Sequence, residues 1–359
     1  MSNENNISPD VLIHPGCRIE NSSIGPGCVI GAEGPAIIEN CQLGRNVKLK
    51  GGTFSGAVFL DGASMGSGAH VRAGTILEEE ANGAHSVGLK QTVLLPFVTL
   101  GSLINFCDVF MAGGTSRKNH SEVGSSYIHF NFTPNQDKAT ASLVGDVPHG
   151  VLLNQKPIFL GGQGGLVGPA RIAYGSVIAA GGICRKDILE EGQLYVSPAP
   201  AEKIIPFKPG HYGNIDRIVQ NNLIYIGNIN ALKAWYQNVR VLFIRDEFDQ
   251  ACLDGALVNL NLILNERVHR LEKLAETFPY IEKMILEIAK HLVAPDLSSE
   301  RGGETSFDRV ASSALMAEVE AADKTGYIAA VQNLGIGACA GATSWMQGIV
   351  NEPGNAQGN

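Results

Sequence analysis

Aliphatic residues recur every six positions through the first half of the chain, from residue 13 to about residue 187. Two uninterrupted runs keep this step: Phe59, Met65, Val71 and Leu77, and later Leu160, Leu166, Ile172 and Ile178. A period of six is neither the 3.6-residue period of an amphipathic helix nor the simple alternation of a half-buried strand. The chain must therefore fold into a structure whose own repeating unit contains six residues.

Three six-residue edges would form a triangular coil of about 18 residues. The aliphatic residue of each edge would point inward, and the small residues and glycines that follow would let the chain turn the corner. An isolated coil cannot bury its core, whereas a stack of coils can. We therefore predict a β-solenoid over residues 11–195, with about eight to ten coils. The repeat resembles that of the hexapeptide-repeat family, which implies a left-handed parallel β-helix.

The composition suits a repetitive β structure, because glycine is abundant, with 43 residues, and aromatic residues make up only 6% of the chain. The net charge of −8 argues against nucleic acid as a partner. The sequence contains neither a signal peptide nor an apolar run of about 18 residues, so we expect a cytoplasmic protein without a membrane span. The seven cysteines include no C-x-x-C pair, so no disulfide framework or metal site is expected. Cys17, Cys28 and Cys41 occupy the small position of the repeat, where we expect buried thiols.

A different pattern begins after the repeat. Four prolines in residues 196–210 predict an extended linker, which we assign to residues 196–212. Leu257, Leu264, Leu271 and Phe278 recur every seven residues, which predicts a helix over residues 246–278 within an α-helical domain of residues 213–350. Further helices are expected over residues 280–292 and after the capping residue Ser306. Asn261 and Asn265 interrupt the apolar stripe, so we favour a helical bundle packed on the solenoid or between subunits over a coiled coil.

The repeat lapses at RKNHSEVGSSYIHFNFTPNQDKAT, residues 117–140. This segment gathers the polar residues Lys118, Asn119, His120, His129, Asn131 and Lys138. Insertions of this kind project from the coils of repeat proteins and often carry their function. A histidine exchanges protons near neutral pH, lysines can hold phosphate, and an asparagine amide can bind a sugar or an acyl group. The alternative is a solvated loop whose lysines and histidines only face water.

Residues 85–190 resemble the acetyltransferase domain of the bifunctional bacterial enzymes that make UDP-N-acetylglucosamine. The family's Ser-Lys-x-Asn-His motif is similar to SRKNH at residues 116–120, and its Asn-Tyr and Lys-x-Lys-Thr elements resemble Asn131-Phe132 and Lys138-Ala139-Thr140. Further matches follow in the family's order: Val144-Gly145-Asp146, Ile178-Ala179-Ala180-Gly181 and Arg185-Lys186-Asp187. The sequence departs from the pattern at Phe132, where the family has tyrosine. An alternative alignment places Phe106 at the family's catalytic histidine.

The resemblance implies an acyl-CoA-dependent N-acyltransferase acting on an amino-sugar phosphate or a nucleotide sugar. It implies that His120 is the catalytic base and that the substrate is bound by Lys118, Asn119, Asn131 and Lys138. It further implies that acetyl-CoA, the acyl donor, is contacted by Ala180, Arg185 and Lys186, although the last two could equally end the solenoid with charge. Three solenoids would pack side by side in a homotrimer, with a site in each groove. The repeat begins at residue 13, so we expect no uridyltransferase activity from this chain.

A second hypothesis comes from another functional class. The chain could be a catalytically silent solenoid that binds a nucleotide sugar or serves as an assembly scaffold. The missing tyrosine and the two possible placements of the catalytic histidine favour this alternative. The two hypotheses differ in whether His120 lies in an inter-subunit groove near Asn131 and Lys138.

Overall fold

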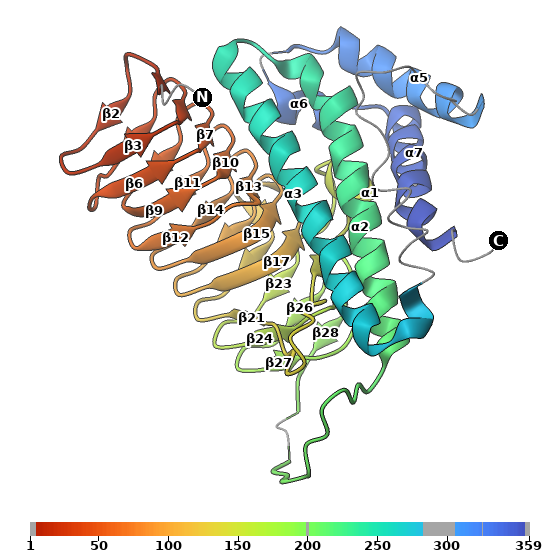
Figure 1. Cartoon of the computed structure of the whole chain (residues 1–359). Coiled ribbons are helices and arrows are strands. Elements are labelled where there is room, and N and C mark those ends of the chain that lie inside the picture. Colours follow the sequence, from red (N-terminus) through yellow and green to blue (C-terminus); the bar gives the residue numbers. More distant parts are fainter. Residues whose placement is uncertain (1–4, 199–200, 283–305, 325, 356–359) are drawn as a thin grey trace.

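The computed structural model describes residues 5–198, 201–282, 306–324 and 326–355. A β-solenoid is followed by a helical region that lies along one of its sides (Figure 1). The predicted fold class is confirmed: the molecule is a parallel β-solenoid with a C-terminal helical region, consistent with a left-handed β-helix. The solenoid has about 11 turns rather than eight to ten, and its first strand, β1 (Asn6–Ile7), lies ahead of the predicted start.

Three stacks of short strands form the sides of the solenoid, which we call faces I, II and III. Face I is a ten-stranded sheet of β2 (Leu12–Ile13), β5 (Val29–Ile30), β8 (Lys48–Leu49), β11 (Ser64–Met65), β14 (Asn82–Gly83), β16 (Thr99–Leu100), β20 (Glu122–Val123), β23 (Phe159–Leu160), β26 (Val177–Ile178) and β28 (Leu194–Tyr195). Face II holds β3 (Arg18–Glu20), β6 (Ala36–Glu39), β9 (Gly52–Ser55), β12 (Ala69–Val71), β21 (Ile128–Phe130), β24 (Gly165–Val167) and β27 (Ile183–Cys184). Face III holds β1, β4 (Ser23–Ile24), β7 (Gln42–Leu43), β10 (Ala57–Phe59), β13 (Thr75–Leu77), β22 (Ser142–Val144) and β25 (Arg171–Ile172). The longer strands β15 (Gly88–Leu94) and β17 (Asn105–Met111) run across both faces II and III.

Each strand pairs in parallel with the equivalent strand of the next coil, so that Ile13 lies beside Ile30 and Ile30 beside Leu49. From the second coil on, the aliphatic residues of the repeat point inward and are buried, as the period of six predicts. Cys28 and Cys41 are buried among them. Burial raises the pKa of both thiols to about 12, so neither cysteine is a nucleophile near neutral pH. Cys17, in the first coil, is only partly buried.

The helical region contains α2 (Ile215–Asn238), α3 (Glu247–Thr277), α5 (Ser306–Ala321), α6 (Tyr327–Gln332) and α7 (Ile336–Asn355). Short 3-10 turns lie at Arg240–Phe243 and Pro279–Ile281. Asp246 caps α3 by accepting hydrogen bonds from the backbone N–H groups of Phe248 and Asp249, and α5 begins at Ser306. The helix expected over residues 280–292 lies mostly outside the described residues. Within the described ranges, no helix is long and apolar enough to cross a membrane.

The helices α2 and α3 lie side by side along face III (Figure 1). The helix α3 contacts β4, β7, β10 and β13, and α2 contacts β22 further along the solenoid. Gly255 permits the close approach of α3, because a Cβ atom at this position would lie 2.2 Å from Oε1 of Gln42. The expected packing of helices on the solenoid is thus seen within one chain, and it covers the outer surface of face III.

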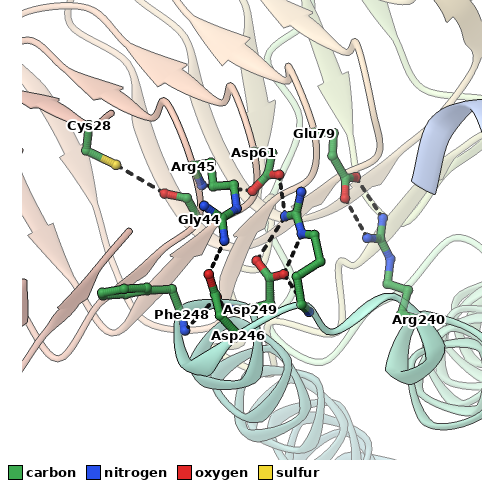
Figure 2. A network of polar contacts seen from close by, with 10 residues as sticks. Cys28, Gly44, Arg45, Asp61, Glu79, Arg240, Asp246, Phe248 and Asp249 are labelled. Atoms are coloured by element: carbon green, nitrogen blue, oxygen red, sulfur yellow. Dashed lines mark hydrogen bonds and ion pairs between the residues drawn. The ribbon is translucent and has the colours of Figure 1, made fainter. Parts of the chain in front are cut away.

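Ion pairs fasten the beginning of α3 to the solenoid corner between faces III and I (Figure 2). The pairs are Arg45–Asp246, Arg245–Asp61, Arg240–Glu79 and, deeper in the interface, Arg240–Glu78, and Arg245 also pairs with Asp249 within the helical region. The side chain of Arg240 is only 8% exposed and lies 3.9 Å from the centre of the Tyr327 ring. The contact between helices and solenoid therefore contains buried charges, which stabilise it only while their partners are in place.

Candidate functional site

The segment of residues 117–140 crosses two different corners of the solenoid. A hairpin of β18 (Gly114–Ser116) and β19 (Asn119–His120) projects between the end of β17 on face III and β20 on face I. A loop of residues 131–141 projects between β21 on face II and β22 on face III. Within one chain, His120, Lys118 and Asn119 are therefore at one corner, and Asn131 and Lys138 are at another.

The hairpin is anchored to the solenoid through its turn residue Arg117. The guanidinium group of Arg117 donates hydrogen bonds to the Phe97 carbonyl (2.8 Å) and to Oγ1 of Thr99 (3.0 Å). Lys118 and Asn119 are exposed, and Nδ2 of Asn119 donates to Oγ1 of Thr115 within the hairpin. His120 is half-buried, and its Nδ1 atom is buried without a hydrogen-bond partner among the described residues. Part of this ring is exposed at the surface, where a second molecule can reach it.

The loop at the other corner borders a pocket of about 200 Å³, which we call the loop pocket. The loop contributes Phe132, Thr133, Pro134, Asn135, Asp137, Ala139 and Thr140. The opposite wall includes Arg185 from the last coils and His211, Tyr212 and Arg217 from the start of the helical region. The structure thus brings Arg185, a predicted acetyl-CoA contact, to the loop that carries Asn131 and Lys138.

Hydrogen bonds from distant segments fix the shape of this loop. Oδ1 of Asn135 accepts from the Gly210 N–H group (2.8 Å), and Asp137 accepts from the Tyr212 hydroxyl. Nδ2 of Asn222 in α2 donates to the Ala139 carbonyl at 2.9 Å. Oδ1 of Asn131 accepts from the Thr140 hydroxyl inside the loop at 2.9 Å, which leaves the Asn131 amide NH₂ for a ligand. These contacts hold the predicted binding residue in one conformation.

A buried arginine connects the same loop to the solenoid corner beneath it. Arg267 of α3 is only 1% exposed and donates to Asp108 at 2.9 Å and to Gln91 at 3.3 Å. Its other terminal nitrogen faces the Lys138 carbonyl at 3.5 Å. The Lys138 side chain itself is exposed. The backbone of Lys138 is thus fixed by α3, while its ammonium group remains accessible to a phosphate.

His129 lies inside the solenoid rather than on the loop surface. Ile128 is exposed and His129 is buried, so the two side chains lie on opposite sides of β21. Its Nε2 atom lies 2.8 Å from the hydroxyl of Ser142. Burial lowers the pKa of His129 to about 4, so the ring is neutral at physiological pH. Between the two histidines of the segment, only His120 is placed to meet a substrate.

The predicted acyl-donor residues lie in the last coils. Ala180 is exposed at the corner between faces I and II, and Arg185 and Lys186 are exposed after β27. Only Arg185 among these residues lines the loop pocket. In the part of the chain that the structure describes, no group of three or more His, Cys, Asp or Glu side chains is arranged to hold a metal ion.

Sequence reasoning missed the residues that close the loop pocket from the helical side. Tyr212 and Arg217 lie far from the loop in sequence, and Arg217 is held by Asp187 at 2.9 Å. No motif marks these residues, because their role depends on how the helical region returns to the last coils. The composition of the loop indicated only a turn. It did not reveal that Gly210 and Tyr212 donate hydrogen bonds to Asn135 and Asp137.

Comparison with known proteins shows which proteins this chain is similar to in sequence. No family model matches the chain. The bifunctional protein GlmU of Pelobacter propionicus is 28% identical over 196 residues, which are 54% of this chain and 38% of that protein. The bifunctional protein GlmU of Thermotoga sp. (strain RQ2) is 28% identical over 183 residues, which are 51% of this chain and 37% of that protein. The chain therefore matches less than two fifths of the length of these relatives.

The match falls on the acetyltransferase region of the GlmU proteins. The solenoid fits the hexapeptide-repeat family. The resemblance that was read from the motifs is thus confirmed by sequence similarity over about half of this chain. A solved structure of UDP-N-acetylglucosamine acyltransferase from Arabidopsis covers 82% of this chain and 99% of its own, with 14% identity and a TM-score of 0.23. That score is too low to carry an argument about this chain.

Proposed function

We propose that this hexapeptide-repeat protein is an acyl-CoA-dependent N-acyltransferase that acts on an amino-sugar phosphate or a nucleotide sugar, with acetyl-CoA as the donor. The observation that carries the proposal is the loop pocket, which joins the loop of Asn131 and Lys138 to Arg185 in a solenoid similar to the acetyltransferase region of GlmU. Arg185 and Lys138 are exposed cations, and neither side chain has an ion-pair partner among the described residues. Cations of this kind suit the phosphate groups of a sugar phosphate and of coenzyme A.

The reaction needs a base and a means to hold two substrates. The amine nitrogen attacks the thioester carbon, an amide bond forms, and the carbon–sulfur bond breaks to release the thiol. His120 would act as the general base and take the proton that the amine loses. Lys118 and Lys138 would hold the phosphate of the sugar, and the amides of Asn119 and Asn131 would contact its hydroxyl or acyl groups. Ala180, Arg185 and Lys186 would contact the donor.

A homotrimer would unite the two corners that are separate in one chain. The helices cover face III, so faces I and II are the sides that can meet neighbouring solenoids. When face I of one chain packs on face II of the next, the III–I corner of the first lies beside the II–III corner of the second. The hairpin of His120 would then lie against the neighbour's loop pocket. The trimer and its inter-subunit site are part of the proposal.

The scaffold alternative has one observation in its favour. Within a single chain, His120 does not share a corner with Asn131 and Lys138. A monomer would therefore keep a small pocket lined by the exposed cation Arg185, without His120 beside it. Such a chain could bind a nucleotide sugar without converting it.

The proposal is tested by acetyl-CoA turnover with free-thiol detection, using glucosamine-1-phosphate and related amino-sugar phosphates and nucleotide sugars. His120→Ala should lower kcat by about 10²- to 10⁴-fold, because it removes the general base. Lys138→Ala should mainly raise KM, because a phosphate contact is made equally in the ground and transition states. His269→Ala is the matched control, since His269 is an exposed histidine of α3.

Two outcomes would count against the proposal. If His120→Ala retained the wild-type rate while the fold was intact, His120 would not be the base. If wild type turned over none of these substrates but bound a nucleotide sugar in calorimetry, the scaffold function would replace the transferase function.

A further inference from the structure

A larger pocket, separate from the loop pocket, lies between face III and the helices α2 and α7. Its volume is about 340 Å³. The short helix α1 (Val147–Gly150), which follows β22 at the III–I corner, forms one rim. The opposite rim is formed by Ile224 and Asn228 of α2 and by Gln347 and Val350 of α7. We call this space the α1 pocket, and no residue assigned above to the acyltransferase site lines it.

A histidine–aspartate pair stands at the α1 rim. The Nδ1 atom of His149 lies 2.9 Å and 3.0 Å from the two carboxylate oxygens of Asp146. The backbone of Asp146 is fixed by Tyr174, whose hydroxyl donates to the Asp146 carbonyl at 2.6 Å and accepts from the Asp146 N–H group at 2.9 Å. Asp146 therefore holds the ring in one orientation, and Nε2 remains free for a ligand. The hydrogen bond to Asp146 also raises the pKa of His149, which favours the charged ring.

An arginine on the floor of the α1 pocket lacks a partner. Arg171 of β25 lines the pocket, and among the described residues its guanidinium group makes no hydrogen bond or ion pair. Its Nε atom is fully enclosed and has no acceptor. An enclosed charged donor without an acceptor is costly. A bound anion would accept hydrogen bonds from the terminal nitrogens of Arg171, and the planar guanidinium group suits a carboxylate or phosphate.

The remaining lining limits the ligand to a small organic molecule. Leu143, Ile172 and Ile224 give the pocket an apolar wall on which a short carbon skeleton can lie. Glu191 is the other carboxylate that lines the pocket besides Asp146, and it is exposed at the mouth. We propose that the α1 pocket binds a small organic anion, a carboxylate or a phosphate monoester, whose charged group is held by Arg171 and His149.

Calorimetric titration with succinate and with glycerol 3-phosphate tests this site and distinguishes the two anion types. Wild type is expected to bind at least one of the two probes, more tightly at pH 6 than at pH 8.5, because a larger fraction of His149 is charged at the lower pH. Arg171→Gln should weaken binding by about 10- to 100-fold, since a hydrogen bond to a charged group contributes ~1.5–3 kcal/mol. His149→Gln should weaken binding and reduce the preference for pH 6 relative to wild type, leaving binding through Arg171.

The control is Arg18→Gln, which removes an exposed arginine near the other end of the solenoid and should bind the probe like wild type. Circular dichroism of each variant without ligand verifies the fold. The proposal is overturned if neither probe binds wild type at millimolar concentration, or if folded Arg171→Gln binds as tightly as wild type. Acetyl-CoA turnover does not enter these measurements, so failure of the proposed transferase function would leave the outcome unchanged.

Discussion

At the scale of single residues, His129 is a position where the apolar rule of the solenoid core is broken. His129 pairs with Leu166 in the neighbouring strand β24, and its backbone occupies an ordinary inward position of β21. The imidazole is accommodated because Ser142 supplies a hydrogen-bond partner. Its pKa of about 4 lies below the usual value of 6.5, because burial disfavours the charged ring. The cost of this burial must therefore appear as the solution becomes acidic.

The folded protein should lose stability through His129 as the pH falls from 6.5 towards 4. In this window the unfolded chain binds a proton at His129 and the folded chain does not, so protonation favours unfolding. The expected loss is about 3 kcal/mol, at 1.36 kcal/mol per pKa unit. His129→Gln keeps a hydrogen-bonding group without the titration, and its urea midpoint should fall less over this range. His269→Gln, at an exposed position, should follow wild type; parallel profiles for His129→Gln and wild type would disprove the effect.

Much of the solenoid could be predicted at this scale, because the repeat places one inward residue in every edge. The period predicted the buried positions of Ile24, Leu43 and Phe59, and the small positions of Cys28 and Cys41. It could not predict which corner a loop projects from. The corner depends on where the chain departs from the six-residue step. The long strands β15 and β17 are such departures, because each runs over two faces without a break. Hence His120 and Asn131 could be singled out but not placed relative to each other.

At the scale of elements, the position of α3 on face III depends on charges that sequence periodicity does not reveal. The seven-residue spacing predicted the helix and its extent closely. The contact itself uses Arg240, which reaches Glu78 at 2.5 Å and Glu79 at 2.8 Å. The Tyr236 hydroxyl also donates to Glu78 at 2.8 Å. Glu78 and Glu79 lie far from Arg240 in the chain, so neither spacing nor composition indicates that these residues meet.

Removing Arg240 should loosen the helical region from the solenoid. Arg240→Ala leaves two buried carboxylates without a cation, which typically costs about 3–5 kcal/mol. Hydrogen exchange in α2 and α3 should become faster, while exchange in the inner strands of the solenoid should change little. Arg240→Met combined with Glu78→Gln and Glu79→Gln removes all three charges and should recover most of the protection. If the triple variant were as unstable as Arg240→Ala, packing and not charge would explain the role of Arg240.

At the scale of the whole molecule, apolar side chains remain exposed on the faces that the helices leave free. Phe159, Val177 and Leu194 lie in register on face I and are 39%, 37% and 67% exposed. Further along the chain, Ile204 and Phe207 project from the linker and are 96% and 66% exposed. Neighbouring apolar residues of this kind mark a surface that binds another protein. They support the proposed homotrimer, in which face I meets face II of the next chain.

Light scattering should therefore give the mass of three chains. Val177→Glu combined with Leu194→Glu places charges in the proposed interface and should shift the mass towards a monomer. Acyl transfer should be lost when the trimer dissociates, because each site would need two chains. Val258→Glu is the matched control, since Val258 is 64% exposed on α3 and outside faces I and II. A monomeric wild type would exclude this assembly.

Mixing two inactive variants decides whether the active site is shared between chains. One variant carries His120→Ala, and the other carries Asn131→Ala together with Arg185→Ala. If the base comes from one chain and the loop pocket from its neighbour, random mixing in equal amounts should restore about a quarter of the sites in the closed trimer. If both corners served the same chain, every site in the mixture would contain a defect, and turnover would stay at the level of the separate variants. Subunit exchange, verified with a tagged chain, makes either result decisive.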